Sequence, residues 1–208
     1  MGRTRVKICG ITSPEDGRLA AAAGADAIGL VFHPDSPRAV TPERAAEIRA
    51  ALPPFVTAVG LFVDPDREQV EWTLAACSLD LLQFHGDEAP GFCAGFGRPY
   101  LKAVRVGPEA DLEAAARLYG AERLLLDALV PGQPGGTGRS FNWSLIPPDL
   151  GPKVVLAGGL DPENAGEAVR WVGPYAVDVS SGVEERPGVK SAERVAAFMR
   201  GVRDADRG

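Results

Sequence analysis

Features that would place this 208-residue chain in a special class are scarce or missing. Its three cysteines, Cys9, Cys77 and Cys93, are too few and too far apart for a disulfide framework, so we expect reduced thiols. No apolar run approaches the roughly 18 residues of a transmembrane helix. No signal-peptide pattern opens the chain, so we expect a cytoplasmic protein without a membrane partner. The formal net charge of −6 and the lack of a basic run disfavour binding to nucleic acid.

Two further absences concern cofactors. No GxGxxG sequence follows the first predicted strand, which disfavours an open sheet that binds a dinucleotide. There are only two histidines, His33 and His85, and neither HxH nor HExxH spacing occurs. Zinc or iron held by both histidines, with Asp64 or Asp178 as further ligands, is therefore a less favoured alternative.

Apolar runs of strand length alternate with helix-length amphipathic segments along the whole chain. The runs are at residues 5–10, 26–32, 55–63, 80–86, 100–106, 123–130, 153–159 and 175–182. Most are continuously apolar, which is typical of parallel strands covered on both faces. Eight strands, each followed by a helical segment, predict a (β/α)8 TIM barrel. Because no linker or change in composition interrupts the chain, we expect one domain over residues 1–208.

Capping residues mark where several helices should begin. Thr41 before Pro42, and Asp161 before Pro162, predict two N-caps followed by proline in the first turn. The last helix is expected to begin at Ser191.

Polar residues gather where the predicted strands end, which is the catalytic end of a (β/α)8 barrel. They are Cys9, His33, Asp35, Arg38, Asp64, His85, Arg105, Asp127, Asp178, Ser180 and Ser181. Their positions predict an active site at this end of the barrel, with His85 and Asp178 among the residues of its mouth.

The last two predicted strands end in the turns LAGGL and DVSSGVE. The residues that could supply space, amides and hydroxyls to an anion there are Gly158, Gly159, Ser180, Ser181 and Gly182. Barrel enzymes often bind phosphate at these two loops, so we predict a phosphate site. The alternative is that the glycines serve only the tight packing of the turns.

Cys9 ends the first predicted strand, and Gly10 follows it at once. Lys7 has the same side-chain parity, so both side chains are expected to face the mouth. A nearby ammonium group would favour the thiolate and suit Cys9 to act as a base or nucleophile. A buried, unreactive thiol at the end of a strand is equally compatible with the sequence.

Asp127 lies among leucines in RLLLDALV, where burial would favour the protonated form that a general acid needs. A structural carboxylate is the alternative. Arg38, in FHPDSPRAV, suits a carboxylate ligand, although a surface arginine would have the same sequence context. The glycine-rich segment 132–143 is expected to cover the site.

With these residues in view, the chain resembles the phosphoribosylanthranilate isomerases of tryptophan biosynthesis. The matching stretches, in the order of the family, are KICGIT, GLVFHPDSPRAV, GLFVD, QFHGDE, LLLD, GGTGRSFNW, LAGGLDPENA and VDVSSGVEERPGVK. They span nearly the whole chain. QFH stands where many relatives have QLH, and this departure leaves the histidine in place.

The resemblance implies a (β/α)8 enzyme that performs an Amadori rearrangement without a metal or organic cofactor. The family's general base corresponds to Cys9 and its general acid to Asp127. Arg38 would hold the anthranilate carboxylate, the AGG and SSG turns would hold the phosphate, and Gly10 would leave room for the substrate. The expected partner is thus a small phosphorylated molecule, and the chain is expected to be a monomer or a homodimer.

Two rival functions remain open at this point. One is a sugar-phosphate epimerase that uses a metal held by His33 and His85. The other is a catalytically silent protein that binds a phosphorylated ligand and would not need a cysteine and an acid at the rim.

Overall fold

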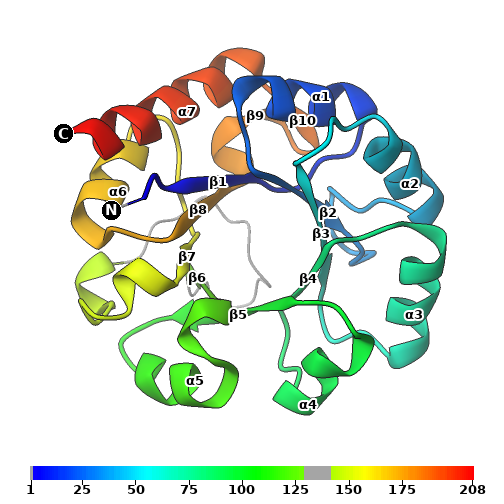
Figure 1. Cartoon of the computed structure of the whole chain (residues 1–208), viewed down its shortest axis with the longest axis horizontal. Coiled ribbons are helices and arrows are strands. Elements are labelled where there is room, and N and C mark those ends of the chain that lie inside the picture. Colours follow the sequence, from blue (N-terminus) through cyan, green and yellow to red (C-terminus); the bar gives the residue numbers. More distant parts are fainter. Residues whose placement is uncertain (1, 129–141) are drawn as a thin grey trace.

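Eight parallel strands form a closed barrel in the order β1 to β8, with β1 paired to β8 (Figure 1). The computed structural model describes residues 2–128 and 142–208. The strands are β1 (Arg5–Ile8), β2 (Ala27–Val31), β3 (Thr57–Phe62), β4 (Leu81–Phe84), β5 (Tyr100–Val106), β6 (Leu124–Ala128), β7 (Val155–Leu156) and β8 (Ala176–Val179). Each falls within one predicted apolar run, and the predicted (β/α)8 barrel is confirmed.

Helices surround the barrel on its outside (Figure 1). They are α1 (Pro14–Ala23), α2 (Pro42–Ala50), α3 (Arg67–Ala76), α4 (Pro90–Cys93), α5 (Leu112–Tyr119), α6 (Ala165–Val172) and α7 (Ala192–Arg207). Short 3₁₀ helices are η1 (Ala94–Phe96), η2 (Ala121–Arg123), η3 (Trp143–Leu145), η4 (Gly151–Lys153) and η5 (Ser181–Val183). A small hairpin of β9 (Glu184–Arg186) and β10 (Val189–Lys190) follows η5 and precedes α7.

Most of the predicted helix starts agree with the structure. Thr41 and Ser191 cap α2 and α7, each accepting a hydrogen bond from the backbone N–H three residues later. The prediction at Asp161 was wrong, because α6 begins only after Asn164. The carboxylate of Asp161 accepts hydrogen bonds from the N–H groups of Glu163 and Asn164, and so closes a turn ahead of the helix.

The core has an outer and an inner part. The outer part lies between strands and helices and includes Phe62, Phe84 and Phe198, which are fully buried. The inner part fills the barrel with the small cluster Ala103, Leu125, Val155, Ala157 and Ala176. A further cluster inside the barrel consists of Cys9, Val31 and Leu61. The functional end of the barrel therefore rests on packed apolar side chains rather than on an open channel.

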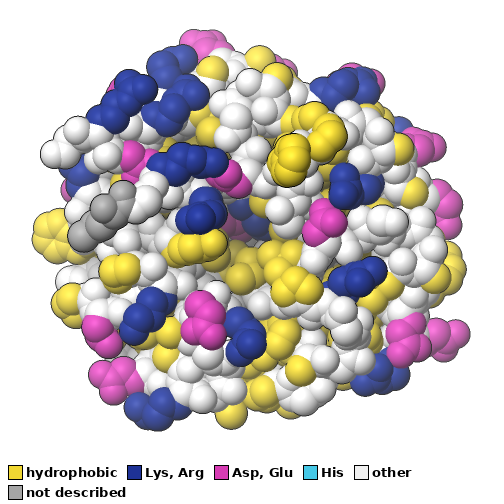
Figure 2. All heavy atoms as spheres, viewed as in Figure 1, with side chains coloured by type: hydrophobic (Ala, Val, Ile, Leu, Met, Phe, Trp, Pro, Cys, Tyr) yellow, Lys and Arg dark blue, Asp and Glu magenta, His cyan; other side chains and the backbone are white. Residues whose placement is uncertain are grey.

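One end of the barrel is seen in the space-filling view, where hydrophobic side chains gather near the middle (Figure 2). Lysine, arginine, aspartate and glutamate side chains of both signs lie mainly around them (Figure 2). Within the described residues, no helix combines the length and the apolar character needed to cross a membrane.

Candidate active site

The ends of the barrel strands surround a cavity of about 520 Å³. This volume is within the range of small-molecule sites. The predicted site residues that line it are Cys9, Arg38, His85, Asp127, Gly158, Gly159, Asp178, Ser180 and Ser181. Lys7 and Gly182 were predicted here too, but neither is among the lining residues.

Lys7 lies beneath the cavity and is paired with Asp178. Its Nζ donates a hydrogen bond to Asp178 Oδ1 at 2.9 Å, and the two side chains are 5% and 9% exposed. The pair forms because barrel closure places Lys7 directly beside Asp178 in the register of β1 and β8. Gly29 on β2 leaves the space, since a Cβ there would lie 2.5 Å from Cys9 Sγ and 3.1 Å from Lys7 Nζ. Lys7 therefore points into the barrel on the same side as Cys9, as the parity predicts, but it lies below the mouth and does not line the cavity.

Cys9 is buried at the floor of the cavity, and its pKa is raised. Burial is the main cause of the rise, the positive charge of Lys7 lowers the pKa, and Asp178 raises it again. Lys7 does lower the pKa of Cys9, as expected from its positive charge. Burial nevertheless outweighs it, because Asp178 already balances the charge of Lys7. The pKa of Lys7 is itself raised: burial lowers it, but the charges of Asp178 and Cys9 outweigh that effect.

Asp127 is linked to His85 on the other side of the cavity. His85 Nε2 lies 3.0 Å from Asp127 Oδ2, and the N–H of Ala128 donates to Asp127 Oδ1 at 2.8 Å. Gln83 Nε2 lies 3.2 Å from His85 Nδ1. Strand β4 points Gln83 and His85 into the barrel because they are two residues apart. Gln83 was not predicted as a site residue from the sequence, although this parity is visible there.

The amide of Gln83 can serve either tautomer of His85. Its side chain is fully buried, and its Oε1 makes no hydrogen bond among the described residues. With the amide as placed, Gln83 donates to Nδ1, so the ring proton is on Nε2 and faces Asp127. A half turn of the amide would offer Oε1 to a proton on Nδ1, leaving Nε2 to accept a hydrogen bond from a protonated Asp127. Gln83 and His85 can therefore adapt to Asp127 both with and without its proton.

The loops after β7 and β8 contact each other closely. Gly158 has φ of 81°, and a Cβ there would lie 2.5 Å from the backbone nitrogen of Ala128. A Cβ on Gly182 would lie 2.0 Å from the carbonyl oxygen of Leu160. The packing alternative thus accounts for the glycines at 158 and 182. The N–H groups of Gly158 and Gly159 donate to no other described residue, so they are available to a ligand in the cavity.

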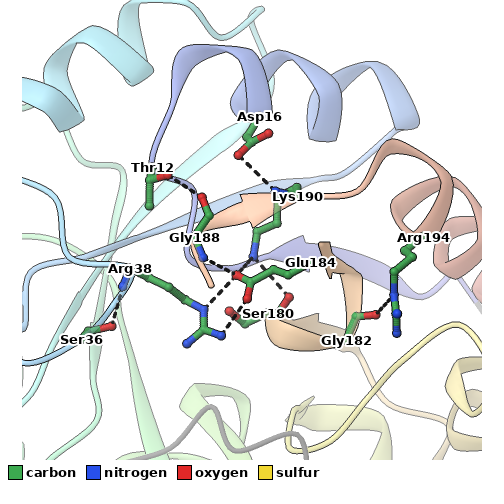
Figure 3. Close-up of polar contacts among 10 residues, drawn as sticks. All are labelled: Thr12, Asp16, Ser36, Arg38, Ser180, Gly182, Glu184, Gly188, Lys190 and Arg194. Atoms are coloured by element: carbon green, nitrogen blue, oxygen red, sulfur yellow. Dashed lines mark hydrogen bonds and ion pairs between the residues drawn. The ribbon is translucent and has the colours of Figure 1, made fainter. Parts of the chain in front are cut away.

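Arg38 forms a two-pronged ion pair with Glu184 (Figure 3). The Nε and Nη2 atoms of Arg38 donate to the two carboxylate oxygens at 2.8 and 2.7 Å. Lys190 Nζ donates to Glu184 Oε1 at 2.7 Å. Neither Glu184 nor Lys190 was predicted as a site residue from the sequence. The signal that could have found them is the Pro187–Gly188 turn, which pairs the two residues across a hairpin.

Gly10 makes room for Arg38, and its predicted role in making room for the substrate stays a prediction. Gly10 has φ of 74°, and a Cβ there would lie 2.5 Å from Arg38 Cδ and 3.0 Å from Ser180 Oγ. A larger residue at this position would displace the arginine from the rim.

The remaining rim residues do not form a common site. His33 lines the cavity, and its Nε2 lies 3.9 Å from Asp35 Oδ2. In residues 2–128 and 142–208, no three side chains of His, Cys, Asp or Glu come together as metal ligands. The predicted cover falls largely, at residues 132–141, outside the described residues.

Residues 6–201 match the family model described as N-(5′phosphoribosyl)anthranilate (PRA) isomerase. The chain belongs to the phosphoribosylanthranilate isomerase family. The N-(5′-phosphoribosyl)anthranilate isomerase of Azotobacter vinelandii is 60% identical over 206 residues, which cover 99% of this chain and 100% of the relative. The resemblance inferred from the motifs is thus confirmed.

Solved structures of phosphoribosylanthranilate isomerases have the same fold. One, in complex with reduced 1-(o-carboxyphenylamino)-1-deoxyribulose 5-phosphate, is 40% identical with a TM-score of 0.85, and covers 97% of this chain and 99% of its own. Monomers generated from the dimeric enzyme of Thermotoga maritima are 39% identical with a TM-score of 0.85, at the same coverage. In this member of the phosphoribosylanthranilate isomerase family, KICGIT forms the end of β1 and the turn after it, and DVSSGVE forms the end of β8, η5 and the start of β9.

Proposed function

We propose that this chain converts N-(5-phosphoribosyl)anthranilate into 1-(2-carboxyphenylamino)-1-deoxyribulose 5-phosphate, a step of tryptophan biosynthesis. The observation that supports this most is that Cys9 and Asp127, on strands far apart in sequence, line one cavity with Arg38 at its rim. Family membership at 60% identity over nearly the full length supports the same reaction. The reaction needs only proton transfers, so this acid and this base suffice without a cofactor. Since substrate and product are water-soluble phosphates, we propose the cytoplasm as the location.

The substrate binds between the two ends of the cavity. The free N–H groups of Gly158 and Gly159 and the hydroxyls of Ser180 and Ser181 hold the phosphate. Gly182 also lets the two loops pack together. At the other end Arg38 binds the anthranilate carboxylate. The sugar then lies across the cavity between Cys9 and Asp127.

The first step opens the sugar ring. Asp127, protonated, donates its proton to the ring oxygen while the C1′–O bond breaks. The lone pair of the anthranilate nitrogen forms the C1′=N bond of a protonated Schiff base. Asp127 is left as a carboxylate, which accepts hydrogen bonds from the N–H of Ala128 and, in the tautomer with the ring proton on Nε2, from His85. These two donors stabilise the charge as it forms.

The second step moves a proton from C2′. The thiolate of Cys9 takes that proton, and the electrons of the C–H bond form a C1′=C2′ double bond while the nitrogen becomes neutral. The resulting enolamine tautomerises to the aminoketose. Because burial raises the pKa of Cys9, the thiolate fraction and the rate are expected to rise with pH from neutral to alkaline values.

The direct test is turnover of phosphoribosylanthranilate generated in situ, followed by the loss of its fluorescence with EDTA present. Saturable loss above a blank without enzyme is the expected result. Activity that appears only with a divalent metal and another sugar phosphate would favour the epimerase that uses His33 and His85. Binding of sugar phosphates without any turnover would favour the silent binding protein.

We propose further that two copies of the chain form a homodimer through the loop before β3. The side chain of Phe55 in this loop is fully exposed and has φ of 71°, an unusual backbone conformation for an aromatic residue. A relative described as dimeric supports a second copy as the covering partner. Sedimentation equilibrium should give a dimer for the wild type and for Trp72→Ser, which changes another exposed aromatic, and a monomer for Phe55→Ser.

A further inference from the structure

The hairpin after β8 holds two opposite charges side by side. Glu184 and Lys190 are register partners across antiparallel β9 and β10. The turn between them includes Gly188, which has φ of 80° and needs the freedom of glycine. Thr12 Oγ1 donates to the carbonyl of Gly188 at 2.6 Å, and the N–H of Lys190 donates to Asp16 Oδ2 at 3.2 Å. The hairpin is therefore fixed to the loop after β1 and to α1 (Figure 3).

Both charges are buried and depend on each other. The side chains of Glu184 and Lys190 are 4% and 0% exposed. Besides the ion pair, Lys190 Nζ donates to the carbonyl of Ser180 at 3.2 Å, and the N–H of Gly188 donates to Glu184 Oε1 at 3.3 Å. Burial would raise the pKa of Glu184, but hydrogen bonds from Arg38 and the charge of Lys190 hold it below its ordinary value. A buried charge without these partners would be strongly destabilising.

Glu184 occupies one edge of the Arg38 guanidinium and leaves the other edge free. Both bonds to the carboxylate come from Nε and Nη2, and the remaining nitrogen points away from Glu184 (Figure 3). Nη1 donates to no other described residue, and Arg38 lines the cavity. A guanidinium offers five N–H donors in a planar fork, so the free edge can receive a second carboxylate.

The charges of the network decide how strongly that second carboxylate is attracted. Arg38 and Glu184 alone would sum to zero. Lys190 adds one positive charge and restores a net charge of plus one to the group. Glu184 thus fixes the direction of the Arg38 side chain but neutralises its positive charge. Lys190 restores a positive charge to the group, so that a ligand carboxylate is still attracted.

We propose that Glu184 and Lys190 are positioning residues that make Arg38 selective for a carboxylate on the aromatic part of the substrate. This inference rests on the proposed function, in which Arg38 binds the anthranilate carboxylate. It differs from a purely structural role of the hairpin in one respect: the charge of Lys190 matters for ligand discrimination, not only for folding.

The experiment compares two competitive inhibitors of the full-length protein. The first is reduced 1-(o-carboxyphenylamino)-1-deoxyribulose 5-phosphate, and the second is the same molecule with hydrogen in place of the carboxylate. The ratio of their inhibition constants reports carboxylate recognition alone, since both contain the same sugar phosphate. It is measured in the wild type, Lys190→Met, the double variant Glu184→Gln/Lys190→Met, and Thr12→Val. The last loosens the hairpin without changing any charge.

Lys190→Met should reduce the discrimination about tenfold or more, the scale of one charge-assisted hydrogen bond. The inhibitor without a carboxylate should bind as it does to the wild type. The double variant again has a net charge of plus one, because both hairpin charges are gone, and the amide oxygen of the Glu184→Gln side chain can still accept a hydrogen bond from Arg38. It should therefore recover most of the lost discrimination. Thr12→Val should discriminate as the wild type does. If Lys190→Met does not fold, Lys190→Gln, which keeps a donor for Ser180, takes its place.

Other outcomes separate the failure of this inference from that of the proposed function. A double variant that discriminates no better than Lys190→Met overturns the charge argument. Equal losses for both inhibitors in every hairpin variant, including Thr12→Val, would reduce the hairpin to a structural element. If the wild type itself does not distinguish the two inhibitors, Arg38 does not bind the carboxylate and the proposed function fails at that point.

Discussion

The two sides of the cavity handle their reactive groups differently. On the β1 and β8 side, Cys9 lies above an ion pair, Lys7 with Asp178, whose charges already satisfy each other. On the β4 and β6 side, Asp127 is itself a member of the hydrogen-bonded chain with His85. Cys9 is therefore affected mainly by burial and by the charges of Lys7 and Asp178, with a smaller effect of a hydrogen bond from Lys7. Asp127, in contrast, is held by direct hydrogen bonds.

This difference predicts two kinds of response to substitution. Changes around Cys9 should move the pH dependence of the reaction, because the neighbours alter the pKa of the thiol. Changes around Asp127 should lower the rate at every pH, because they remove a bond to the reacting group itself.

The largest effect is expected when the acid is removed. Asp127→Asn should lower kcat by about 10³ or more, within the range for loss of a general acid, because an amide cannot give a proton to the ring oxygen. Binding of the carboxylate-containing inhibitor should persist, as measured by equilibrium titration. Loss of that binding would make Asp127 a ligand contact or a structural residue instead.

Removal of the base should have the next largest effect. Cys9→Ser should lower kcat by about 10² or more, since a serine hydroxyl is a far weaker base than a thiolate at the same pH. Steady-state kinetics with phosphoribosylanthranilate gives the number. Near-normal turnover would remove Cys9 from the mechanism and leave the Asp127 side alone responsible for the proton transfers.

A smaller loss is expected when the donor to Asp127 is removed. His85→Leu should lower kcat about tenfold or more at all pH values, because a hydrogen bond to a charged group contributes about 1.5–3 kcal/mol. KM should change little, since His85 is proposed to contact the acid rather than the substrate. A loss confined to one end of the pH range would mean that His85 acts by titration and would erase the contrast between the two sides.

The smallest effects at the optimum should come from the ion pair beneath Cys9. Lys7→Met should raise the pKa of Cys9, because the charge of Lys7 lowers it, and Asp178→Asn should lower it, because Asp178 raises it. The rise of kcat/KM with pH should therefore move to higher pH in the first variant and to lower pH in the second. The rate of thiol alkylation against pH measures the same shift independently. Movement in the same direction in both variants would refute the electrostatic account.

The fold was predictable because its signals are local. Strand positions follow from apolar runs a few residues long, and the polar residue at the end of each run shows where the site lies. Cys9, Asp127 and Arg38 could be placed at the cavity in this way, and all three line it. The start of α6 was missed because the carboxylate of Asp161 caps a turn, which has the same local sequence as a helix cap.

The parts that could not be predicted depend on contacts between distant segments. The position of Lys7 below the cavity and the raised pKa of Cys9 follow from the pairing of β1 with β8. The partnership of Arg38 with Glu184 joins residues 146 positions apart, and no spacing rule connects them. The reason for Gly10 is likewise invisible until the side chain of Arg38 lies over it.

Because β1 pairs with β8, the barrel can close only late in synthesis on the ribosome. Lys7 and Asp178 are 171 positions apart, and translation proceeds at about 5–20 residues per second, so β1 emerges on the order of ten seconds before its last neighbour exists. During that interval Cys9 has no ion pair beneath it and no phosphate loop beside it. We therefore expect no activity from the incomplete nascent chain. The proposed reaction becomes possible only when β8 has left the ribosome and closed the barrel against β1.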